Sequence, residues 1–156
     1  MMSDSSFWNG ELSPVLRAVD AGQCPVLVSG LGAASRAHFA AGLRRVLEMP
    51  LVVVSPDDSA AETFARDLEA LLGIPVTLLL SREFAFYPAD SAGHVAEQKR
   101  VAALDALSRG MAVVTVCTVA ALTQRCIPPE ALQRSAFTIS AGQTSDPEAV
   151  ERALLQ

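Results

Sequence analysis

The chain has 156 residues, 51% of them hydrophobic, and a formal net charge of −5 at pH 7. This length allows one domain with an ordinary core, and the negative charge argues against a free-standing nucleic-acid binder, which needs clustered Lys and Arg. The longest apolar runs, residues 50–54 and 76–80, are too short to cross a bilayer, and the first ten residues do not resemble a secretion signal. We therefore expect a cytoplasmic globular protein without a membrane partner.

Aliphatic and β-branched segments alternate with helical patterns along the chain. This alternation predicts an α/β fold, a parallel sheet with helices on both faces. The predicted strands cover residues 25–29, 51–55, 76–80, 112–116 and 136–139. The predicted helices cover residues 12–21, 35–48, 59–72 and 92–108, with shorter turns after Thr118 and around residues 129–133. Gly73 and Gly110 are expected to end the last two of these helices.

The first predicted strand, the loop after it and the next helix have the layout of a phosphate-binding motif. In the pattern G-x-x-x-x-G-K-[ST], backbone N–H groups and the Lys hold phosphates while the hydroxyl binds Mg²⁺. Gly30 keeps the first glycine, but Ser35, Arg36 and Ala37 stand where Gly, Lys and Ser/Thr are needed. Ser35 adds a Cβ where the backbone must approach a phosphate, and Ala37 cannot ligate a metal. We therefore predict a degenerate P-loop at Gly30, Gly32, Ser35 and Arg36.

Other interpretations of this loop stay open. Gly30 and Gly32 can make a tight strand-to-helix turn that never bound a nucleotide. The chain can also be a phosphate- or nucleotide-binding α/β enzyme that uses the loop from Gly30 to Arg36, because a helix amino terminus attracts anions. A dinucleotide fold is a weaker match, since Gly-x-Gly lacks a distinctive third glycine. No predicted strand ends in an acidic residue of the magnesium-binding kind, so we expect no catalytic residues and no ATPase activity.

The segment at residues 81–94 follows the carboxyl end of a predicted strand. It contains two Phe residues and the only Tyr of the chain. Loops at strand carboxyl ends are where open α/β sheets place their sites. Phe84, Phe86 and Tyr87 are therefore a candidate partner surface, and the alternative is a lid that folds over the sheet edge.

The remaining reactive side chains give no catalytic or metal pattern. Cys24, Cys117 and Cys126 lack C-x-x-C spacing, which favours reduced structural thiols. His38 and His94 have no Cys or His at ligand spacing, so no metal site is expected.

The adjacent basic pairs are predicted to lie on solvated helix faces. They are Arg44–Arg45 and Lys99–Arg100, and both fall on helical patterns. A last helix is predicted to start at a capping-box pattern, residues 145–148, close to the end of the sequence. A helix that begins so late suggests a fragment of a longer polypeptide.

Taken together, the segments resemble the amino-terminal region of the bacterial transcription-repair coupling factor family (Mfd). This region is itself similar to UvrB, the damage-recognition subunit of the excision nuclease. The resemblance rests on the order and spacing of residues 28–38, 51–61, 84–90, 98–107, 112–122 and 128–129. It implies a UvrB-like, helicase-like domain with a degenerate phosphate loop over residues 1–140. Residues 141–156 would then be the truncated start of the following domain, of the type that recruits UvrA.

The resemblance also implies a function. The segment would be a non-catalytic platform for partner recruitment and regulation in transcription-coupled nucleotide excision repair, with no cofactor of its own. ATP and Mg²⁺ are expected only in the motor domains of the parent protein, an ATP-dependent DNA translocase. RNA polymerase and DNA would be contacted through regions absent from this sequence. Residues 81–94 leave little room for the aromatic hairpin of UvrB, so direct damage recognition is not expected.

Overall fold

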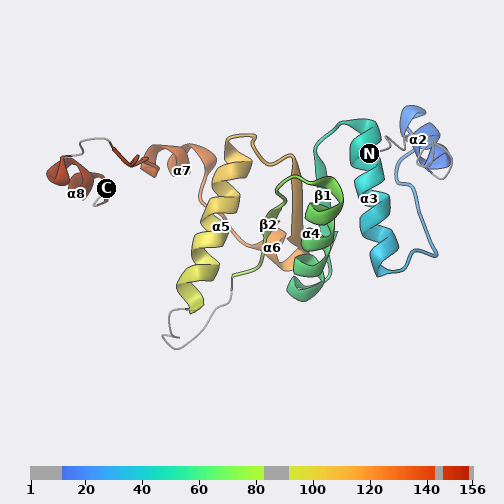
Figure 1. Cartoon of the computed structure of the whole chain (residues 1–156), viewed down its shortest axis with the longest axis horizontal. Coiled ribbons are helices and arrows are strands. Elements are labelled where there is room, and N and C mark those ends of the chain that lie inside the picture. Colours follow the sequence, from blue (N-terminus) through green and yellow to red (C-terminus); the bar gives the residue numbers. More distant parts are fainter. Residues whose placement is uncertain (1–11, 83–91, 143–145, 155–156) are drawn as a thin grey trace.

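The computed structural model of the chain describes residues 12–82, 92–142 and 146–154. Its elements in chain order are α2 (Ser13–Asp20), α3 (Ala33–Leu47), β1 (Leu51–Ser55), α4 (Asp58–Leu72), β2 (Thr77–Leu79), α5 (Ala92–Ser108), β3 (Val114–Thr118), α6 (Val119–Thr123), α7 (Pro129–Ser135) and α8 (Pro147–Leu154). The strands form one parallel sheet in the order β1, β3, β2 (Figure 1). In the register of the central strand, Val116 lies opposite Val53 on one side and Leu78 on the other.

Local signals in the sequence define the ends of α4. The Asp57 carboxylate accepts a hydrogen bond from the Ala60 N–H at 2.8 Å, which makes Asp57 the N-cap. Gly73 ends the helix with a φ of +67°, in the left-handed region that glycine adopts without strain. Gly110, with a φ of +68°, follows α5 in the same way. All four predicted helices are present, with bounds that differ by two residues or fewer at each end.

Two apolar clusters form the core, one on each face of the sheet. The first cluster joins α3 and α4 to β3, and its buried members are Ala40, Ala41, Ala61, Ala65, Leu68, Val114 and Val116. The second joins α5 and α6 to the sheet through Leu79, Ala103, Cys117 and Ala121. Successive residues of a strand point to opposite faces, so Leu78 packs against the first cluster and Leu79 belongs to the second. The predicted α/β fold with helices on both faces is confirmed.

Two of the five predicted strands are absent. Residues 25–29 are not hydrogen-bonded into the sheet, and the Leu27 side chain is 93% exposed. These residues lie on the side of α3 that faces away from β1 (Figure 1). Although their composition is typical of a strand, they therefore do not lie beside a described strand with which they could pair. Residues 136–139 follow α7 away from the sheet, and Phe137 and Ile139 are exposed. A strand needs a neighbouring strand for its backbone groups, and neither segment has one among the residues that the structure describes.

None of the helices in residues 12–82, 92–142 and 146–154 is both long and apolar enough to span a membrane.

Candidate functional site

The predicted phosphate loop connects α2 to α3 without a strand before it. Gly30 has a φ of +84°, which is why a glycine suits this position. Gly32 is the N-cap of α3 in an extended conformation and provides no side chain to accept the first N–H groups of the helix. Because residues 25–29 are not a strand, the loop does not lie at the carboxyl edge of the sheet, where a working phosphate loop would stand.

The side chains of this loop do not converge on a common point. Arg36 folds back, and its Nε–H donates to the Leu31 carbonyl at 3.2 Å. Ser35 is exposed, whereas Ala37, at the position of the magnesium-binding hydroxyl, is completely buried in the core. The structure thus places Gly30 and Gly32 in the loop before α3 and Ser35 and Arg36 at the start of the helix, without arranging them around a common point.

A cavity of about 620 Å³ lies beside the loop between α2, α3 and α4. Its walls are mainly apolar, from Leu12, Leu31, Ala34, Ala37, Phe39, Ala70 and Leu71, with polar groups from Ser35, His38 and Asp67. No Lys or Arg is among these lining residues, and the Asp67 carboxylate would repel a phosphate. The cavity therefore lacks the positive charge that recognition of a nucleotide phosphate requires.

The carboxyl edge of the sheet carries several polar side chains that stabilise the fold. Asp57 caps α4, and Thr118 caps α6 by accepting from the Ala121 N–H at 3.1 Å. The Asp58 carboxylate accepts a hydrogen bond from the Ser81 hydroxyl at 2.8 Å. This last bond joins the start of α4 to the residue that follows β2. The sequence analysis placed residue 81 directly after a predicted strand but missed the partner of Ser81, because 23 positions separate the two residues.

Arg100 corrects the prediction of a solvated helix face. Lys99 is exposed as predicted, but Arg100 is only 8% exposed. Its Nη1 donates to the Leu80 carbonyl, and its Nη2 donates to the Cys126 sulfur at 3.4 Å. The guanidinium therefore joins α5 to the end of β2 and to the loop after α6. The two adjacent basic residues face different surroundings because neighbours on a helix point about 100° apart.

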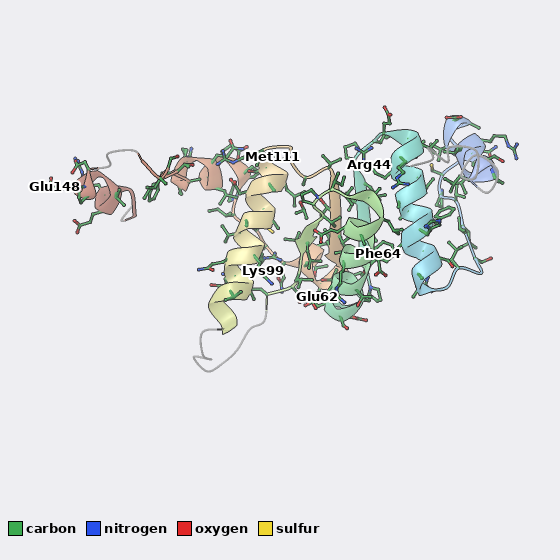
Figure 2. The ribbon with its side chains drawn as sticks, viewed as in Figure 1. Arg44, Glu62, Phe64, Lys99, Met111 and Glu148 are labelled. Atoms are coloured by element: carbon green, nitrogen blue, oxygen red, sulfur yellow. The ribbon has the colours of Figure 1, made fainter. Side chains whose placement is uncertain are left out.

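A second cavity, of about 720 Å³, lies at this edge between α4, β2 and α5. Lys99 and Arg100 from α5 and Asp58 and Glu62 from α4 line it, together with apolar side chains. Lys99 and Glu62 are labelled in Figure 2. Two of these four charged groups already have the structural partners described above. Within the described parts of the chain, no three His, Cys, Asp or Glu side chains gather closely enough to hold a metal ion. The edge thus shows polar links between elements and no assembled nucleophile, base or metal site among the described residues.

Cys117 differs from the other two cysteines because it is 1% exposed, whereas Cys24 and Cys126 are exposed. Burial raises the pKa of the Cys117 thiol, since desolvation disfavours the thiolate. We expect iodoacetamide to modify Cys24 and Cys126 rapidly in the folded chain and Cys117 only after unfolding, as mass spectrometry would show. Equal modification of all three thiols under native conditions would contradict the buried environment.

The raised pKa of Cys117 also has a consequence for stability at high pH. The contribution of the thiol is complete below the pKa of an unfolded cysteine, about 8.5, and it decreases as the pH rises through the higher folded value. The substitution Cys117→Ala should remove this alkaline decrease in the free energy of unfolding.

The candidate partner surface at Phe84, Phe86 and Tyr87 lies outside the residues that the structure describes. Arg82, which precedes this segment, and Glu97, on α5, form an exposed ion pair of 2.7 Å.

Comparison with known proteins gives one informative similarity. The chain is 33% identical over 155 residues to a protein named transcription-repair-coupling factor from Myxococcus xanthus. The similarity covers 92% of this chain but 13% of that protein, so the chain spans about an eighth of the length of its relative. No family model matches the chain. No solved structure matches it either. The chain is thus distantly homologous, along almost its whole length, to one segment of a transcription-repair-coupling factor.

Proposed function

We propose that the chain is a UvrB-like amino-terminal segment of a transcription-repair coupling factor and acts as a non-catalytic platform for partner recruitment. The observation that carries this proposal is the similarity to the Myxococcus xanthus protein along 92% of the chain. That name places the relative in the coupling of transcription to DNA repair, a cytoplasmic process in bacteria. Residues 1–140 would form the platform, and residues 141–156 would begin the domain that recruits UvrA.

The geometry of the phosphate loop supports a role without catalysis. The Arg36 guanidinium is turned onto the Leu31 carbonyl, and the cavity beside the loop has no cationic side chain. Phosphoryl transfer depends on preorganised positive charge around the phosphates. ATP and Mg²⁺ would then be used by the motor domains of the parent protein, and RNA polymerase and DNA would be contacted by other regions of it. The partners of this segment itself would be UvrA and neighbouring domains.

Calorimetric titration with ATP and ADP, with and without Mg²⁺, tests this proposal on the chain itself. We expect no measurable heat of binding up to millimolar nucleotide and no increase in the thermal midpoint, because binding to the folded state alone would raise it. Arg36→Ala should leave both results unchanged.

Micromolar, magnesium-dependent binding would overturn the platform proposal if Arg36→Ala abolished it. Arg66→Ala is the matched control, since Arg66 is an exposed helical arginine on α4, away from the loop. Loss of binding in the first variant and not in the second would assign the loop to an enzyme that binds phosphate groups.

A further inference from the structure

We draw no further inference here: the strongest candidate, the cavity between α4, β2 and α5 at the carboxyl edge of the sheet, has Asp58 and Arg100 in its wall already bound to structural partners, and nothing in the structure shows which ligand the charges of Glu62 and Lys99 would hold.

Discussion

Replacing Leu68 by Ala should lower the free energy of unfolding by about 2–5 kcal/mol, as measured by equilibrium urea denaturation. Leu68 is completely buried in α4 and belongs to the cluster that contains Val114 and Val116 of the central strand. Truncation removes buried methyl groups and leaves a cavity that the neighbouring side chains fill only in part. The effect should be among the largest of any single truncation, because the residue joins the helix layer to the sheet.

Leu27→Ala is the matched control for this prediction. It makes the same chemical change at a side chain that is 93% exposed, so it should change the free energy of unfolding by about 0.5 kcal/mol or less. Similar losses in the two variants would contradict the core described here. A large loss for Leu27→Ala alone would show that residues 25–29 are packed after all, as the sequence predicted.

Replacing Arg100 by Met should lower the free energy of unfolding by about 1–3 kcal/mol. Methionine keeps much of the aliphatic length but donates no hydrogen bond, so the Leu80 carbonyl loses its guanidinium partner at the end of β2. The contact with Cys126 is lost as well, which releases the loop after α6 from α5. Urea denaturation measures the loss, and the Cys126 thiol should become more reactive toward iodoacetamide in the folded variant.

Arg109→Met provides the comparison for Arg100. Arg109 lies on the same side of the sheet and pairs with Asp105 at 2.8 Å, but this pair is on the surface and one helical turn apart. Surface pairs of this kind contribute about 0.5 kcal/mol or less. Equal effects of the two substitutions would mean that Arg100 is solvated, as the basic pair in the sequence suggested.

The two cavities described above differ in the charges that line them, and these charges are relevant to the alternative of a phosphate-binding enzyme. The one beside the phosphate loop is lined mainly by apolar groups, and its charged lining residue is Asp67. The one at the carboxyl edge of the sheet has charges of both signs, but Asp58 and Arg100 already serve to hold α4 and α5 to the end of β2. Neither arrangement concentrates positive charge among its lining residues.

Local chemistry explains why the helices could be predicted closely. Asp57 and Gly73 act within one turn of α4, and the apolar stripe through Ala61, Ala65 and Leu68 selects its buried face. The same reasoning found three strands, although the last of them runs to Thr118 and not to residue 116. Signals of this kind are carried by neighbouring residues and need no tertiary partner.

A segment forms a strand only if another strand lies beside it in the folded chain, and the sequence alone does not contain that information. Residues 25–29 have a strand composition but meet no edge, while β1 has an edge that no described strand meets. Arg100 is buried only because β2 ends beside α5. By itself the sequence determined the alternation of helices and strands, the presence of Ser35, Arg36 and Ala37 at the positions that the phosphate-binding pattern gives to Gly, Lys and Ser/Thr, and the resemblance to a repair coupling factor. Tertiary structure alone decided the strand order, the burial of Arg100 and the open edge of β1, because each depends on contacts between residues far apart in the chain.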